Sequence, residues 1–157
     1  NRDDFIVKDS ELLINPMGWF KGYLDSSGLN INYDLIIEGN PFLRTGDLVK
    51  KNDCGYAYEA RNKEIINING IKFNVIKLEN EIISTFDNIL DSLIIQNKDD
   101  KGFKVFIPLN IKKDIKENDL IKFLFVKTSY IAKIKYVKKI LYTKSLKKIR
   151  NISRYEV

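Results

Sequence analysis

The 157-residue sequence contains no histidine and only one cysteine. The lack of histidine excludes Ser-His-Asp and Cys-His catalysis, and with them most zinc sites. Cys54 has no second cysteine with which to form an internal disulfide, which indicates a reducing compartment and predicts a cytoplasmic protein. Whatever chemistry the protein performs therefore has to use carboxylates, lysine, arginine or backbone groups.

Long apolar segments are also lacking. No run of apolar residues approaches the roughly 20 needed to cross a bilayer. The chain starts at Asn1 without a methionine and without a basic leader followed by an apolar segment. We therefore expect a piece excised from a longer protein rather than an exported precursor. The length suits one domain, or a small domain with a fragment of another.

Acidic residues are missing from one part of the chain. Residues 127–154 carry ten Lys or Arg and no acid, whereas residues 1–126 carry 17 basic and 20 acidic residues. The net charge of +6 therefore belongs to the C-terminal end, where it could attract phosphate groups. An ordinary solvated basic face is the alternative interpretation.

Turn residues and apolar spacing predict several elements. Residues 5–14 alternate in polarity around a polar centre, which predicts a hairpin or two short strands. A second hairpin is predicted around Asn69-Gly70, a dipeptide suited to a type I′ turn because both central residues need positive φ. Asn74 is a good helix N-cap, and the apolar spacing after it predicts a helix over residues 75–86.

The remainder of the chain predicts a small layered domain. Strands are expected over residues 89–96 and 103–109, a helix over 117–126, and a strand over 133–137. The order from Tyr56 onward is hairpin, helix, strand, strand, helix, strand, which predicts an α+β fold with a short sheet packed by helices.

Several motifs, in the same order, resemble the adenylate-forming superfamily, which contains acyl- and aryl-CoA synthetases, nonribosomal peptide synthetase adenylation domains and luciferases. Residues 44–48 match the family's R-T-G-D-L, and residues 61–66 are similar to its G-R-x-D/K-x-x-I. Residues 143–147 resemble the closing T-x-S-G-K. Further matches fall at residues 10–14 and 20–24, at Gly55-Tyr56, Gly70 and Leu78-Glu79, and at Arg150.

This resemblance implies the C-terminal portion of an ATP-dependent ligase that forms an acyl-adenylate and passes the acyl group to a thiol. It implies that residues 1–60 are the β-rich end of a large N-terminal domain and contribute a nucleotide-site loop. Residues 61–157 would be a mobile C-terminal lid domain. The fragment alone is predicted to be inactive, because the phosphate-binding loop and the acyl pocket belong to the missing N-terminal domain.

The resemblance also implies roles for five residues. Asp47 would accept hydrogen bonds from the ribose hydroxyls of ATP, and Arg61 would contact ribose or phosphate oxygens. Lys63 occupies the hinge position about which the lid rotates. Gly70 would face the tunnel for the thiol-bearing acceptor. Lys147 would be the catalytic lysine of adenylation, with the family register favouring it over the adjacent Lys148.

The implied ligands follow from the same resemblance. ATP with Mg²⁺ is the nucleotide, and the metal ligands are expected in the missing portion, so none is assigned here. CoA or phosphopantetheine is the acceptor, the latter carried by an acyl or peptidyl carrier protein. The chain identifies neither the carboxylic acid nor which of these thiols is used.

Three departures from the family pattern leave a noncatalytic relative as one alternative. Ala60 replaces the usual Gly before Arg61, Leu146 replaces the Gly before Lys147, and Lys77 replaces a frequent Glu. The Leu146 change matters most, because Gly tolerates backbone geometry that Leu does not.

A nucleic-acid-binding module is the other alternative. It would use the basic residues 127–154 together with stacking aromatic rings. We prefer the adenylate-forming interpretation, because nucleic-acid binding leaves the ordered motifs from Arg44 to Glu79 unexplained. The tyrosines available for such stacking are Tyr130, Tyr136, Tyr142 and Tyr155.

Overall fold

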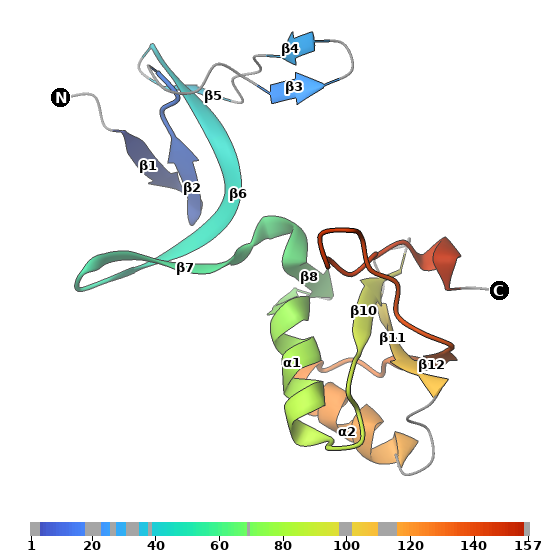
Figure 1. Cartoon of the computed structure of the whole chain (residues 1–157). Coiled ribbons are helices and arrows are strands. Elements are labelled where there is room, and N and C mark those ends of the chain that lie inside the picture. The colour runs from blue at the N-terminus through green and yellow to red at the C-terminus, as the bar shows by residue number, and fades with distance from the viewer. Residues whose placement is uncertain are drawn as a thin grey trace. The chain divides into compact units, whose positions relative to one another are not determined.

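The computed structural model describes residues 4–17, 23–25, 28–30, 35–37, 39–68, 70–97, 102–109 and 116–155. The chain divides into two compact units, Asn1–Lys63 and Glu64–Val157, which Figure 1 colours from blue to green and from green to red. The sequence places the domain boundary between residues 60 and 61, and the units meet three residues later.

The first unit begins with the expected hairpin. Strands β1 (Phe5–Lys8) and β2 (Glu11–Ile14) pair in antiparallel register. Asp9 and Ser10 connect them with φ of 52° and 66°. Short polar side chains tolerate this left-handed region better than bulky ones, so the polar turn fixes the register of the hairpin.

A long strand, β6 (Asn40–Asn52), organises the rest of the first unit. Within its described residues, the sheet order is β1-β2-β6-β5, with β7 (Gly55–Arg61) also paired to β6. β5 spans Leu35–Ile37, and β3 (Tyr23–Asp25) pairs separately with β4 (Gly28–Asn30). Figure 1 shows β6 as the long curved ribbon that reaches from β2 to β7. Of the motif at residues 20–24, residues 20–22 lie outside the described part.

The second unit opens on the predicted second hairpin, which follows a single 3₁₀ turn, η1 (Asn62–Glu64). β8 (Ile65–Ile68) and β9 (Ile71–Asn74) pair with Ile68 opposite Ile71. Gly70 has a φ of +85°, the positive value that its turn requires, whereas Asn69 lies outside the described residues.

Helix α1 (Val75–Thr85) follows β9 directly, one residue shorter than predicted. The Asn74 side chain accepts hydrogen bonds from the backbone N–H groups of Ile76 and Lys77, at 2.8 and 3.1 Å. The predicted N-cap is therefore confirmed.

The sheet of the second unit contains β10 (Leu93–Gln96), β11 (Phe103–Pro108) and β12 (Lys133–Val137). β10 and β11 are antiparallel; β11 and β12 are parallel and are connected through helix α2 (Glu117–Thr128), as parallel strands require a crossover. α2 runs two residues beyond its predicted end. A 3₁₀ turn, η3 (Ile152–Arg154), follows near the C-terminus.

The predicted strand over residues 89–96 is wrong in its first half, because strand pairing begins only at Leu93. Ile89 is buried, but its backbone N–H closes a turn onto the Phe86 carbonyl instead of joining the sheet. An apolar run signals burial, and burial alone does not distinguish a strand from a loop that enters the core.

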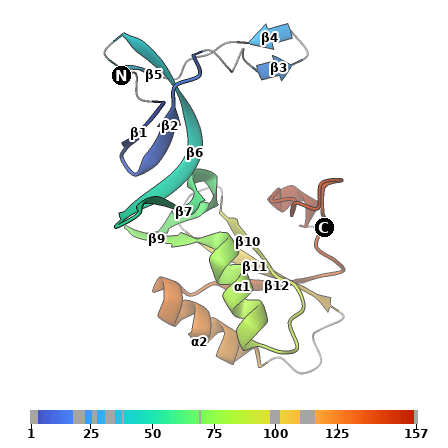
Figure 2. The ribbon, with the colours of Figure 1, turned by 60° about the vertical axis from the view of Figure 1, so that its left-hand side comes forward.

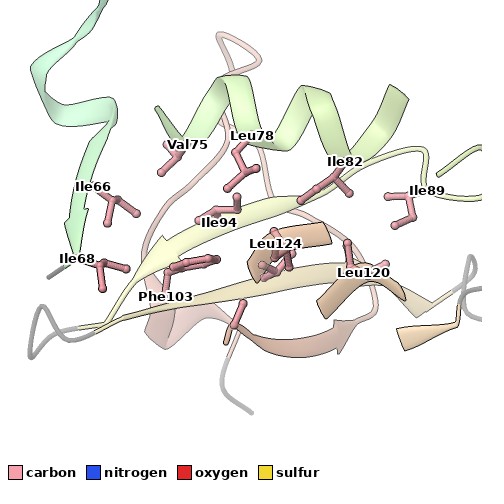
Figure 3. Close-up of a cluster of buried hydrophobic side chains, with 13 residues drawn as sticks. Ile66, Ile68, Val75, Leu78, Ile82, Ile89, Ile94, Phe103, Leu120 and Leu124 are labelled. Atoms are coloured by element: carbon pink, nitrogen blue, oxygen red, sulfur yellow. The ribbon is translucent and has the colours of Figure 1, made fainter. Parts of the chain in front are cut away.

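Both faces of the three-stranded sheet are buried. On one face, Ile94 and alternate residues of β11 pack against α1 and α2 in the main core, shown in Figure 3. On the other face, Leu93, Ile95 and Phe106 pack with Ile152 and Tyr155 of the C-terminal segment. Figure 2 shows this red segment on the side of the sheet away from the helices. The α+β prediction is confirmed.

No helix in the described ranges combines the length and apolar character needed to cross a membrane.

The core predicts a clear contrast between two isoleucines of α1. Ile82 is fully buried, whereas Ile76 is 37% exposed on the same helix. Ile82→Ala should lower the free energy of unfolding by about 2–5 kcal/mol through lost transfer energy and a cavity. Ile76→Ala should cost well under half as much. Urea unfolding followed by far-UV circular dichroism measures both, and equal losses would contradict this core.

Candidate functional site

A bulge in β6 creates the first part of the candidate site. β2 pairs Leu13 with Arg44 and Glu11 with Leu48, so two steps along β2 correspond to four along β6. The extra residues lie at 45–47, where Gly46 adopts a φ of +73°. A bulge of this kind bends the strand and turns side chains out of the ladder. The T-G-D segment is therefore pushed out of regular pairing.

Glu11 holds this bulge, although sequence reasoning gave it no role. The residue is 6% exposed, and its carboxylate accepts hydrogen bonds from the Gly46 backbone N–H at 3.1 Å and from Arg44 Nη1 at 2.8 Å. Thr45 Oγ1 adds a hydrogen bond to the Leu12 carbonyl at 2.7 Å. The available signal in the sequence was an acid at the start of an otherwise apolar strand.

The pairing of β6 with β7 brings two predicted site residues together. Asp47 lies opposite Arg61 in the register, and Asp47 Oδ1 is 2.8 Å from Arg61 Nε. The Asp47 backbone N–H donates to Thr45 Oγ1 at 3.0 Å, which ties the acid to its own bulge. Asp47 Oδ1 is screened from solvent and has no well-aligned hydrogen bond to any described residue. The carboxylate therefore retains capacity to accept hydrogen bonds.

A surface hollow of about 480 Å³ lies at this junction and is lined by residues of both motifs. Arg61 and Lys63 supply two positive charges at the hollow, and Thr45 and Asn62 supply neutral polar groups. Arg61 and Lys63 are both exposed. The set combines a forked cationic donor, a compact cation and a nearby carboxylate, which suits a ligand bearing both hydroxyl and anionic groups. The five lining residues are Thr45, Gly46, Arg61, Asn62 and Lys63.

Lys147 lies in a tight turn of the second unit. The Thr143 backbone N–H donates to the Lys147 carbonyl at 2.8 Å, and the Lys147 N–H donates to Thr143 Oγ1 at 3.1 Å. An antiparallel bridge between Tyr142 and Lys148 closes the turn. The Lys147 side chain is exposed. Within the described residues, its ammonium group therefore has no partner to leave before it contacts a ligand.

Leu146 keeps the backbone geometry that glycine would adopt. Its φ is +59°, and its N–H donates to the Thr143 carbonyl at 3.0 Å. The side chain is 82% exposed, so it projects into solvent and does not reshape the turn. The departure from the family's glycine therefore leaves the left-handed turn intact.

The neighbouring lysine is engaged in a different way. Lys148 is 18% exposed and lies 3.3 Å from Glu79 and 2.9 Å from Asp91. Asp91 also accepts a 2.6 Å hydrogen bond from the Tyr142 hydroxyl. Burial, followed by this hydrogen bond and the charge of Asp91, raises the pKa of Tyr142 to about 12. Of the two adjacent lysines, Lys147 is the exposed one.

The five predicted site residues fall into separate groups. Arg61 and Lys63 line the hollow of the first unit, and Asp47 contacts Arg61 beside it. Gly70 and Lys147 belong to the second unit, where Gly70 is exposed at the tip of the β8–β9 hairpin. Among the described residues, no three His, Cys, Asp or Glu side chains form a group that could hold a metal ion.

No protein-family model matches the sequence, and no curated protein gives a significant match. Solved structures do match by fold. Klebsiella oxytoca NpsA, in complex with 3-hydroxyanthranilyl-AMSN, is 19% identical with a TM-score of 0.58, covering 92% of this chain and 30% of its own. o-Succinylbenzoate CoA synthetase (MenE) from Bacillus subtilis, in complex with the acyl-adenylate intermediate OSB-AMP, is 18% identical with a TM-score of 0.64, covering 89% and 29%.

The amide bond synthetase McbA from Marinactinospora thermotolerans is 15% identical with a TM-score of 0.60, covering 96% of this chain and 33% of its own. The chain thus spans about 30% of the length of the structures it matches. The resemblance to adenylate-forming enzymes is confirmed at the level of the fold, and the chain corresponds to one part of that fold.

The left-handed turn at Leu146 gives a local prediction. In Leu146→Gly, relief of about 1 kcal/mol of left-handed strain is offset by a more flexible unfolded chain. Hydrogen exchange at the Thr143 amide should therefore change less than about fivefold. Leu146→Pro should remove the protection, because proline fixes φ near −65° and lacks the N–H that bonds Thr143. Equal exchange in both variants would contradict the turn geometry.

Proposed function

We propose that this chain is the C-terminal portion of a larger ATP-dependent ligase that activates a carboxylic acid as its adenylate and passes the acyl group to a thiol. Residues 1–60 would complete a large N-terminal domain, and residues 61–157 would form a mobile lid. The carboxylic acid would bind mainly to the N-terminal domain, beyond this chain. A cytoplasmic location fits the reduced cysteine and the use of ATP.

The observation that carries the proposal is the direct pairing of Asp47 with Arg61. The two residues belong to separate motifs, yet they lie 2.8 Å apart beside one hollow. The fold neighbours strengthen the case, because MenE is described with an acyl-adenylate and NpsA with an AMSN compound. The Asp47–Arg61 contact supplies the proposed site at the β6–β7 junction, and the neighbours' ligands support a nucleotide as the group that would bind there.

Asp47 and Arg61 would share the recognition of the nucleotide. The Asp47 carboxylate, of which Oδ1 is screened from solvent, is an acceptor-only group, which suits the two hydroxyls of a ribose. Arg61, which contacts that carboxylate, would present its forked guanidinium group to ribose or phosphate oxygens. ATP is bound with Mg²⁺, whose ligands we assign to the N-terminal portion, and the metal would neutralise phosphate charge there.

Lys147 would act in the first chemical step. A carboxylate oxygen of the acid attacks the α-phosphorus of ATP, the bond to the β-phosphate oxygen breaks, and pyrophosphate leaves. Negative charge grows on the oxygens around the α-phosphorus as this happens. An ammonium group about 4 Å away would contribute about 4 kcal/mol at an effective dielectric near 20. The exposed position of Lys147 in its turn suits this role.

The second step would follow a rotation of the lid. We assign the hinge to Lys63, which stands at the end of the first unit within the 3₁₀ turn η1. The hairpin at Gly70 would then face the pantetheine arm of CoA or of a carrier protein, and the thiol sulfur would attack the acyl carbon and release AMP. Because glycine has no Cβ, the hairpin tip at Gly70 would let the pantetheine arm come close to the backbone.

A nucleic-acid-binding role has less support. Three of the basic residues on which it depends are paired with acids inside the second unit. Lys127 lies 2.8 Å from Glu81, and Lys148 and Arg150 both contact Glu79. The basic segment is therefore less available to phosphates than its composition indicates.

Carboxylate-dependent exchange of pyrophosphate into ATP tests the proposal. In the longer protein that we propose, Lys147→Ala should lower this exchange roughly thousandfold, the equivalent of about 4 kcal/mol. Lys144→Ala is the matched control, since Lys144 is exposed in the same turn, and it should leave the rate within about twofold of wild type.

Residues 1–157 alone should show no exchange with any acid. Equal rates in wild type and Lys147→Ala would remove this lysine from the mechanism. Absence of exchange in the wild-type protein across a broad panel of acids would favour a noncatalytic relative.

A further inference from the structure

Glu79 is a buried carboxylate to which the motif resemblance gave no role. It is 1% exposed and lies on the inner face of α1, beside Leu78 and Ile82 of the core. An ionised carboxylate in such surroundings is strongly unfavourable unless it is paired and hydrogen-bonded. The groups that pair with this carboxylate must therefore stay close to it. Which residues supply those groups shows which segment Glu79 positions.

Both oxygens of Glu79 are used. Oε1 accepts hydrogen bonds from the Ile94 backbone N–H at 2.7 Å and from Arg150 Nη1 at 2.5 Å. Oε2 accepts from Arg150 Nη2 at 3.0 Å and from Lys148 Nζ at 3.3 Å. The Arg150 contact is bidentate, which fixes direction as well as distance. Glu79 thus joins α1 and β10 to two cations about 70 positions further along the chain.

Those cations follow the turn that carries Lys147. Lys148 is the first residue after it, and besides Glu79 it contacts Asp91 and donates to the Ser92 carbonyl at 2.6 Å. Tyr142, the last residue before the turn, donates to the same Asp91 at 2.6 Å. Both ends of the 143–147 turn are therefore attached to one small region of the unit, next to Glu79.

Two kinds of interaction thus act on the turn. Hydrogen bonds of Thr143 and the left-handed Leu146 determine its shape. The ion pairs of Glu79 and Asp91 hold the Lys148 end of the turn on the unit, which limits opening of the hydrogen bonds within it. The rest of the C-terminal segment has an independent anchor, because Ile152 and Tyr155 pack on the far face of the sheet. Loss of the Glu79 charge should loosen the turn without releasing the whole segment.

From this arrangement we propose that Glu79 is a positioning residue for Lys147. It acts through Lys148 and Arg150, whose attachment to the buried carboxylate holds the exposed lysine at a fixed place on the unit. The consequence for catalysis rests on the proposed function, since only an enzyme that uses Lys147 in adenylation would respond. The structural part of the proposal, that Glu79 orders the turn, stands independently of it.

The structural part is tested by hydrogen exchange on the 157-residue chain. Glu79→Gln keeps the side-chain volume but removes the charge that pairs with both cations. The Thr143 and Leu146 amides, which are bonded within the turn, should exchange about tenfold faster or more, while core amides of α1 and β11 change much less. Glu81→Gln is the matched control, because Glu81 lies on the same helix and its ion pair is with Lys127 of α2, away from the turn.

The catalytic part is tested by a double-mutant cycle in the longer protein. Glu79→Gln should lower the maximal rate of pyrophosphate exchange on the order of 10- to 100-fold, with little change in the KM for ATP. In a Lys147→Ala background it should have no further effect, because its influence passes through that lysine. Glu81→Gln should stay within about twofold of wild type in both backgrounds.

The results separate the two proposals. An equal loss from Glu79→Gln with and without Lys147 would show general destabilisation and overturn the positioning role. Unchanged protection of Thr143 and Leu146 in Glu79→Gln would overturn it as well. If the wild-type protein shows no exchange with any acid, the proposed function fails, and hydrogen exchange still decides whether Glu79 holds the turn.

Discussion

The cost of burying a carboxylate without a partner governs both units of this chain. In the first unit, Glu11 is buried and is neutralised by Arg44 and by the N–H of Gly46. In the second, Glu79 is buried and is neutralised by Lys148 and Arg150. Because an unpaired charge in these places would be strongly destabilising, the segments that supply the partners have little freedom. Each of these segments adjoins residues that we assign to the candidate site.

The same arrangement explains why neighbouring residues in the site have different properties. Lys147 and Lys148 are adjacent in sequence, yet one is exposed and the other is held between two acids. Asp47 and Arg61 are 14 positions apart, yet strand pairing places them in contact. In the second unit, the buried network therefore holds one side of the segment and leaves Lys147 exposed on the other.

Sequence reasoning succeeded where local chemistry dominates. The β8–β9 hairpin follows from a glycine that accepts positive φ, α1 from an N-cap and apolar spacing, and β12 has the bounds that its alternation predicted. It failed at residues 89–92, where an apolar run enters the core as a loop. It also could not assign the partners of Glu79, because those contacts span about 70 positions and depend on how α1, β10 and the C-terminal segment pack. Leu146 seemed a damaging departure because leucine rarely adopts positive φ. Residue type alone could not show that this leucine does.

We propose that the protein containing this chain joins a carboxylate oxygen to the α-phosphorus of ATP. Positional isotope transfer tests this most directly: the protein is supplied with ATP, a thiol acceptor and an acid labelled with ¹⁸O in its carboxylate. Thiol attack then breaks the bond between the acyl carbon and its oxygen, so the account predicts AMP that carries one ¹⁸O from the acid. Acyl transfer that yields unlabelled AMP, or label in inorganic phosphate instead, would contradict it.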